Sequence, residues 1–130
     1  MLEKKILAVD DDSEIRLLFS RFFPSDKYSV TCAASAEEAL EILEKEKFYV
    51  IFLDISLPGM NGIDLCRKIR QDVPYAIIHA VTGYASIFQL ADCRRAGFDD
   101  YYVKPFSRDA LVNAAEAAFT RLARWRGENT

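Results

Sequence analysis

Several residue types are scarce in this chain of 130 residues, and each scarcity excludes a class of protein. Cysteine occurs three times, at Cys32, Cys66 and Cys93, an odd number without the spacing of metal ligands. A disulfide-stapled scaffold and a zinc site are therefore excluded, and we expect small core or half-buried thiols in a reducing compartment. The single histidine, His79, has no second histidine or cysteine at ligand spacing. We expect it to be a packed core residue with locally bonded nitrogens.

Long apolar runs and basic stripes are also missing. No apolar run approaches the roughly 18 residues that span a bilayer, and residues 1–5 lead into an apolar segment without the apolar region of a signal peptide. We therefore expect a cytoplasmic protein without membrane insertion. The formal net charge is -3, and the acids gather at the ends of apolar segments, so direct nucleic-acid binding is not expected.

The chain has the composition of one compact domain. Hydrophobic residues make up 51% of its 130 residues, and the sequence contains no internal repeats or low-complexity segments. A domain of this size buries about two thirds of its unfolded surface without disulfides. We expect a single domain over residues 1–130, with a core from about 4 to 121 and a last helix that extends to about residue 126.

Two short apolar runs end in acids. Residues 49–53 (Tyr-Val-Ile-Phe-Leu) are too short for a helix and rich in β-branched and aromatic types, which predicts a strand buried on both faces. That strand ends at Asp54, and a similar run over residues 5–9 ends at Asp10, Asp11 and Asp12. Open α/β sheets bind ligands at the carboxyl ends of their strands, so these acids are candidate site residues.

An acidic cluster at one sheet edge requires a compensating charge. Two carboxylates about 5 Å apart repel by roughly 3 kcal/mol at an effective dielectric constant of about 20. A fold that brings Asp54 beside Asp10 and Asp11 therefore calls for a hard divalent cation with oxygen ligands, most simply Mg2+. The simpler alternative is that one acid caps the helix beginning near Ser13 while the others face water, and for Asp12 we favour this capping role.

Helical and strand patterns alternate along the rest of the chain. Apolar spacing predicts five helices: over 13–23, from the capping box Ser35–Glu38, over 62–71, over 86–96 and from Ser107 onward. In the fourth of these helices, Leu90 is expected to face inward. Further strands are expected over 28–33, 76–82 and 99–103. The last two end at Thr82 and Lys104, which would place a hydroxyl and a cation at the acidic edge. The alternatives are a β-forming Thr82 with a cap and a solvated Lys104 before a turn. Pro105 could form a cis peptide bond there.

Five alternations of strand and helix predict a parallel sheet with helices on both faces. The expected fold class is α/β, a doubly wound, flavodoxin-like (βα)5 domain with strand order 2-1-3-4-5. Its site falls at the switch between the first and third strands, which carry Asp10, Asp11 and Asp54.

The sequence resembles the receiver domain of two-component response regulators. The resemblance covers about residues 4–121 and rests on four stretches at strand ends, namely 6–12 (ILAVDDD), 54–62 (DISLPGMNG), 81–84 (VTGY) and 96–106 (AGFDDYYVKPF). It implies the chemotaxis-regulator-like, stand-alone type, although a domain cut from a longer regulator would look the same.

The resemblance implies a role for each site residue. Asp54 would accept a phosphoryl group from a sensor histidine kinase or a histidine phosphotransfer protein. Asp11, Asp54 and the Ser56 carbonyl would ligate Mg2+, and Asp10 would reach it mainly through water. Four further residues follow the family pattern: Lys104 and Thr82 would bind phosphoryl oxygens, Thr82 and the aromatic Tyr101 would form the switch, and Ser56 and Tyr84 would modulate the phosphate lifetime.

The resemblance also implies how the protein signals. A phosphoryl charge would bias two arrangements of the face formed by the fourth helix, fifth strand and fifth helix. That face would contact a downstream target or form a homodimer. The protein would be a signalling phosphoacceptor that assists its own phosphorylation and dephosphorylation, rather than an enzyme in the usual sense.

The same residues allow three other interpretations. Asp10 to Asp12 after a strand also resembles the nucleophile motif of haloacid-dehalogenase-type phosphatases, but Asp54 would then have no role. A flavin-binding flavodoxin would need its phosphate where three acids lie, and they would repel it. The serious rival is a pseudo-receiver that keeps the fold and acts as a binding module without phosphate. Phosphorylation of Asp54 by acetyl phosphate with Mg2+ would discriminate it.

Overall fold

The computed structural model describes residues 3–83 and 87–127. Five strands alternate with five helices in chain order: β1 Lys5–Val9, α1 Ser13–Phe22, β2 Ser29–Ala33, α2 Ala36–Lys45, β3 Val50–Asp54, α3 Gly62–Asp72, β4 Ile77–Thr82, α4 Ile87–Ala96, β5 Asp100–Val103 and α5 Arg108–Trp125. All neighbouring strands pair in parallel, and the strand order is β2-β1-β3-β4-β5. The predicted fold class and strand order are confirmed.

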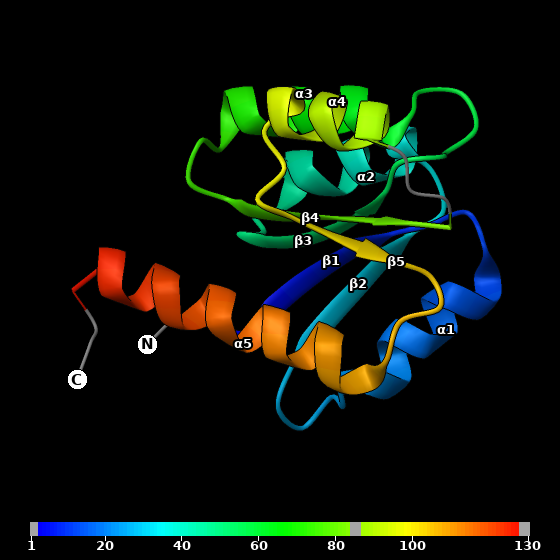
Figure 1. The fold of residues 1–130 in the computed structure, drawn as a ribbon. Coiled ribbons are helices and arrows are strands. Elements are labelled where there is room, and N and C mark those ends of the chain that lie inside the picture. Colours follow the sequence, from blue (N-terminus) through cyan, green and yellow to red (C-terminus); the bar gives the residue numbers. More distant parts are fainter. Residues whose placement is uncertain (1–2, 84–86, 128–130) are drawn as a thin grey trace.

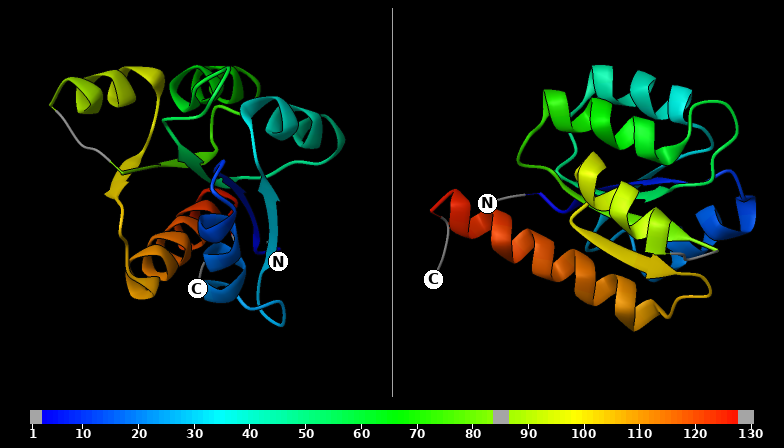
Figure 2. Two further views of the ribbon diagram at one scale, coloured as in Figure 1. Left: turned by 90° about the vertical axis from the view of Figure 1, so that its right-hand side faces the viewer. Right: turned by 45° about the horizontal axis from the view of Figure 1, so that its top comes forward.

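The sheet is the middle layer of three. Helices α2, α3 and α4 cover one face, and α1 and α5 cover the other (Figures 1 and 2). Strand β3 lies in the middle of the sheet, and its residues are all buried. Its side chains alternate between the two cores, with Ile51 and Leu53 on the side of α2–α4 and Val50 and Phe52 on the other. This continuous burial explains why the strand reads as an unbroken apolar run.

Side-chain caps fix where four of the helices begin. Asp12 Oδ1 accepts a hydrogen bond of 2.9 Å from the backbone N–H of Glu14, which confirms the predicted capping role of Asp12. The caps of α2, α3 and α5 are Ser35, Asn61 and Ser107. In the predicted capping box, Glu38 Oε1 accepts from the N–H of Ala34 at 2.6 Å instead of from that of Ser35. Asp12 and Asn61 each stand in a loop that follows a strand carrying a candidate acid.

His79 and the cysteines are core residues, as predicted. The imidazole is 3% exposed, its Nδ1 lies 3.3 Å from the carbonyl oxygen of Ile51, and its ring stacks on Phe52 with centroids 4.5 Å apart. Burial lowers the pKa of His79. Cys66 and Cys93 are buried and Cys32 is half-buried.

One prediction about α4 is wrong. Leu90 was expected to face the core, yet it is 38% exposed, while Cys93 and Ala96 are buried. The apolar residues of α4 do not form one stripe, so the rotation of the helix is set by its packing on α3 and by the burial of Cys93 and Ala96 in the core on this side of the sheet. The Lys104–Pro105 peptide bond is cis. Within residues 3–83 and 87–127, no helix has both the length and the apolar character needed to cross a membrane.

Candidate functional site

The carboxyl ends of four strands carry the predicted site residues. Asp54 and Thr82 are the last residues of β3 and β4, Asp10 follows β1, and Lys104 follows β5. The parallel register pairs Val9 with Leu53 and Thr82 with Val103, so the strands end almost level with one another. These four strands therefore deliver the side chains at their carboxyl ends to one edge of the sheet.

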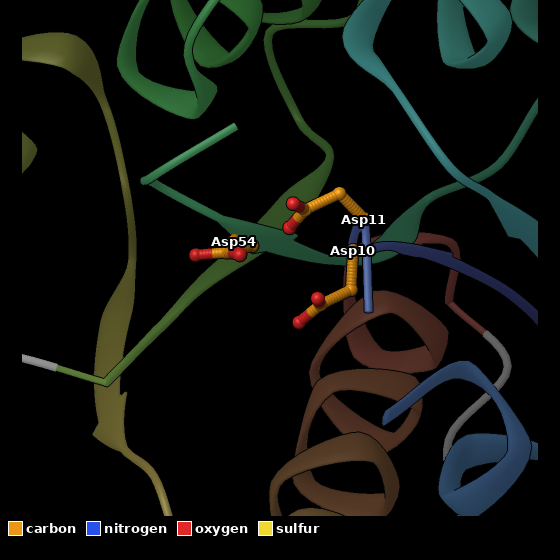
Figure 3. A group of neighbouring side chains, drawn as sticks. All are labelled: Asp10, Asp11 and Asp54. Carbon is orange, nitrogen blue, oxygen red and sulfur yellow. The ribbon is translucent and has the colours of Figure 1, made fainter. Parts of the chain in front are cut away.

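The acids form a cluster at this edge. Asp10, Asp11 and Asp54 each offer a carboxylate oxygen that lies within 4.8 Å of the other two, and the three side chains surround a common space (Figure 3). Asp10 and Asp54 are 1% and 5% exposed, whereas Asp11 is exposed. A set of oxygen donors at this separation suits a hard cation such as Mg2+ and lacks the nitrogen and sulfur ligands that select zinc. The residues present therefore fit the predicted metal.

Lys104 supplies a positive charge beside the acids. Its Nζ lies 2.8 Å from Asp10 Oδ2 and 3.5 Å from Asp54 Oδ2, and its side chain is 21% exposed. Burial lowers the pKa of Lys104, but the hydrogen bond and charge of Asp10 and the charge of Asp54 outweigh it and raise the pKa overall. The amine therefore stays protonated, and the alternative of a solvated lysine is wrong.

Asp54 carries its charge with little access to water. Burial raises its pKa, the charge of Asp10 adds to that rise, and the hydrogen bond from Ser56 and the charge of Lys104 oppose it. The Ser56 N–H donates to Asp54 Oδ1 at 3.0 Å, which holds the carboxylate in one orientation. A buried, oriented and incompletely compensated carboxylate is suited to react with an electrophile or to bind a cation.

Asp10 is fixed by contacts that its sequence pattern does not predict. Its Oδ1 accepts from the N–H of Asp12 at 2.9 Å, and the Arg16 guanidinium donates to its backbone carbonyl at 2.9 Å. Arg16 thus ties the first turn of α1 to the end of β1. Its place one turn after the cap Asp12 is the sequence feature that could have revealed this role.

Gly62 allows α3 to approach the end of β3. A Cβ at this position would lie 2.1 Å from the carbonyl oxygen of Asp54 and 2.8 Å from Cα of Ile55. The Gly62 N–H also donates to the Ile55 carbonyl at 3.3 Å. Only a glycine permits this contact, and it sets the position of the Asp54 backbone. Gly62 ends the stretch 54–62 on which the predicted resemblance rests, but no spacing in the sequence indicates this contact.

The remaining predicted residues surround the cluster. Thr82 is fully buried, and its backbone carbonyl accepts from the N–H of Lys104 at 2.7 Å. Tyr101 is half-buried and packs against the core on the side of α2–α4. Ser56 is exposed. Tyr84 lies outside the residues that the structure describes.

This fold and site define a class: a parallel α/β domain with three carboxylates and a lysine at the switch point of its sheet. Residues 6–116 match the model of the response regulator receiver domain, and the chain belongs to this family. The predicted resemblance is confirmed, and it removes the phosphatase and flavodoxin alternatives.

Curated relatives are transcriptional and regulatory proteins. The chain is 35% identical over 126 residues to the regulatory protein VanR of Enterococcus faecium, covering 97% of this chain and 54% of VanR. It is 34% identical over 119 residues to the transcriptional regulatory protein ResD of Bacillus subtilis, covering 92% of this chain and 49% of ResD. The chain thus spans about half the length of these two relatives.

Solved structures agree with the fold. A CheY-like receiver domain protein from Methanospirillum hungatei is 34% identical, with a TM-score of 0.84, and the match covers 89% of this chain and 93% of that one. The beryllofluoride-activated DrrB receiver domain is 28% identical, also with a TM-score of 0.84, and the match covers 91% and 98% of the two chains.

Membership of the family carries its general properties. Receiver domains are signalling phosphoacceptors of two-component systems and not classical enzymes. They generally bind Mg2+ at an acidic pocket, and they interact with histidine kinases, phosphotransfer proteins and effector partners.

Proposed function

We propose that Asp54 accepts a phosphoryl group from a phosphohistidine on a sensor kinase or phosphotransfer protein. The observation that carries this proposal is the position of Asp54, a buried carboxylate 3.5 Å from Lys104 Nζ and within 4.8 Å of the other two acids. In the reaction, an Asp54 oxygen forms a bond to phosphorus while the bond from phosphorus to the histidine nitrogen breaks. The electron pair of that bond leaves with the imidazole.

Compensation of negative charge is the main requirement of this reaction. Phosphoryl transfer has little covalent chemistry for a protein to assist, so positioning and positive charge account for most of the rate. Asp11, Asp54 and the Ser56 carbonyl, with Asp10 through water, would hold Mg2+, which when bound supplies charge that offsets the transferred group. Lys104 would bind one phosphoryl oxygen and the Thr82 hydroxyl another. The same groups would let the protein promote its own phosphorylation and dephosphorylation, with Ser56 and Tyr84 setting the phosphate lifetime.

We propose further that Thr82 and Tyr101 transmit phosphorylation to the face formed by α4, β5 and α5. Tyr101 is half-buried beside β4, two residues before the end of β5, so a movement of Thr82 would change its packing. Leu90 and Val103 on this face are 38% and 45% exposed, which suits a contact with a target or a second copy. Residues 1–130 would serve as one receiver domain, alone or within a longer protein.

Mass spectrometry of the protein after treatment with acetyl phosphate tests the phosphoacceptor. We expect one phosphoryl adduct on Asp54 when Mg2+ is present and none in excess chelator, because the acids otherwise repel the anion. Asp54→Asn should abolish the adduct. The matched control Asp12→Asn removes an equal charge two residues from Asp10 but keeps a helix cap, so it should leave the adduct intact.

The alternatives predict other results. A pseudo-receiver would give no adduct on Asp54 under any of these conditions. An adduct that persists in Asp54→Asn, or that forms in chelator, would contradict the proposed site.

A further inference from the structure

We propose that a groove at the sheet edge opposite Asp54 binds an acidic peptide segment of a partner protein through an aliphatic or aromatic anchor. The groove has a volume of about 750 Å³ and lies between the end of α5 and the loop that enters β4. Figure 1 shows these two segments at the same end of the molecule, away from the strand ends that carry the acids. We call it the aromatic groove; its lining includes Tyr49, Tyr75, Ile77, Arg121, Leu122 and Trp125.

The aromatic groove combines an apolar floor with exposed rings. Ile77 and Leu122 are 7% and 6% exposed, whereas Tyr75 and Trp125 are 60% and 81% exposed. The ring of Tyr75 lies 5.3 Å from that of Tyr49, which holds it against the wall. An indole left this far in water beside buried aliphatic residues is unusual for a free surface, and tryptophan, tyrosine and arginine are the residues that dominate binding energy at interfaces.

The charge of the aromatic groove selects an acidic partner. Its lining contains three arginines, Arg70, Arg121 and Arg126, and one acid, Asp99. Asp99 is already bound, since its Oδ2 accepts from Arg70 at 3.0 Å and from the Ile78 N–H at 2.8 Å. Arg121 lies 3.9 Å from Asp99 Oδ1, with half its side chain exposed. The lining therefore keeps a positive excess of two charges at an exposed rim.

The helices that end at the groove favour a peptide over a phosphate. Helix α3 ends at Asp72, just before the lining residue Pro74, and α5 ends at Trp125. Both ends are carboxyl termini, whose dipoles oppose a concentrated anion, and neither offers the free N–H groups that bind phosphate. Carboxylates spaced along a peptide can reach the rim arginines while an apolar side chain lies between Tyr75 and Trp125.

A displayed library of random peptides, selected against the full chain, tests the proposal. We expect the enriched peptides to be acidic and to contain a leucine or an aromatic anchor. Trp125 is the single tryptophan of the chain, so a tryptophan-free synthetic copy of an enriched peptide should shift its emission to shorter wavelength as the indole leaves water. Arg121→Glu and Trp125→Ala should each weaken binding about tenfold or more.

The matched control is Arg124→Glu. It makes the same charge change one turn along α5, at an exposed residue that does not line the groove, and it should leave binding nearly unchanged. Trp125→Ala removes a ring that is 81% exposed, so its effect cannot be attributed to unfolding. Neutral or basic enriched peptides would overturn the proposal, as would equal losses in Arg121→Glu and Arg124→Glu or an unchanged Trp125 emission.

The proposal is independent of phosphorylation. The groove lies at the other end of the strands from Asp54, so Asp54→Asn should bind the same peptide with unchanged affinity. Loss of binding in Asp54→Asn would show that binding depends on the acidic edge, and it would contradict a separate site in the groove. A chain that cannot be phosphorylated but binds the peptide would refute the proposed function and leave this inference standing.

Discussion

Asp54 holds a charge in a buried position where burial and a neighbouring acid both raise its pKa above the usual value of 3.8. The folded protein therefore binds a proton at Asp54 more tightly than the unfolded chain does. As the pH rises from the unfolded pKa of Asp54 to its folded pKa, the free energy of unfolding falls. Above the folded pKa, the destabilisation caused by the buried charge stays at its full value. The carboxylate proposed as the phosphoacceptor thus destabilises the metal-free protein at neutral pH.

The first prediction follows from this sign. In chelator at pH 7, Asp54→Asn should be more stable than wild type by about 1 kcal/mol, since it removes a buried charge and keeps an acceptor for the Ser56 N–H. The gain should shrink as the pH falls and disappear well below the usual pKa of 3.8, where Asp54 is protonated in both states. Urea unfolding across this pH range measures it. Mg2+ should stabilise wild type far more than the variant. A variant less stable than wild type at pH 7 would show that the Lys104 contact outweighs burial.

The second prediction concerns Gly62. Gly62→Ala would place a Cβ 2.1 Å from the carbonyl oxygen of Asp54, so α3 or the end of β3 must move. We expect a loss of about 1–3 kcal/mol in the free energy of unfolding together with weaker Mg2+ binding. Gly83→Ala is the matched control, because nothing lies within 4 Å of its added Cβ. Equal effects of the two substitutions in thermal denaturation and Mg2+ titration would exclude a specific contact at Gly62.

At the scale of elements, Arg70 connects segments that are far apart in the chain. From α3 its guanidinium donates to the carbonyls of Pro74, Ala76 and Gly97 and pairs with Asp99. It thereby ties α3 to the start of β4 and to the loop between α4 and β5. The amino ends of these strands are held by one side chain, while their carboxyl ends carry the acidic site.

The third prediction tests this connection. Arg70→Ala should lower the free energy of unfolding by about 2–3 kcal/mol, because it leaves carbonyls and Asp99 without their partner. Arg67→Ala, on the exposed side of the same helix, removes a single pair with Asp64 and should cost about 0.5 kcal/mol or less. Chemical denaturation of both variants measures the difference. Similar losses would mean that the hydrogen bonds of Arg70 contribute little beyond a surface ion pair.

At the scale of the whole molecule, the only histidine of the chain links stability to mild acid. Burial lowers the pKa of His79 from its usual value of 6.5, so the unfolded chain takes up a proton first as the pH falls. The contribution of His79 to the free energy of unfolding is complete above pH 6.5 and is lost as the pH falls below that value. The free energy of unfolding then falls by at most about 1.4 kcal/mol per pH unit.

The fourth prediction isolates this effect. In an Asp54→Asn background, the free energy of unfolding should fall between pH 6.5 and 5 with His79 present. The additional substitution His79→Leu should flatten that decline. Urea titrations at a series of pH values measure both slopes. An unchanged slope in His79→Leu would assign the decline to carboxyl groups.

The fifth prediction concerns association. Beryllofluoride with Mg2+ should strengthen self-association or target binding through the face of α4, β5 and α5. Leu90→Lys should weaken that association. Leu17→Lys is the control, because Leu17 is 50% exposed but lies on α1, outside this face, and it should leave the association unchanged. Sedimentation with and without beryllofluoride measures the homodimer form. A protein that stays monomeric in both conditions would contradict the homodimer. The prediction would then hold only for binding to a different partner protein.

The sequence by itself determined the strands and the edge at which Asp10, Asp11, Asp54, Thr82 and Lys104 meet, and the strand order followed from the doubly wound fold class. Those features follow from local patterns, since an apolar run fixes where a strand ends and parallel strands end on the same side. The tertiary structure decided what depends on pairs of distant residues: the 2.8 Å contact of Lys104 with Asp10, the packing of Gly62 on Asp54, and the connection from Arg70 to Asp99. The exposure of Leu90 and the aromatic groove belong to the same group. The exposure of Leu90 depends on the rotation of α4, and the groove depends on how the long side chains of distant segments pack together. The spacing of residues along the chain encodes neither feature.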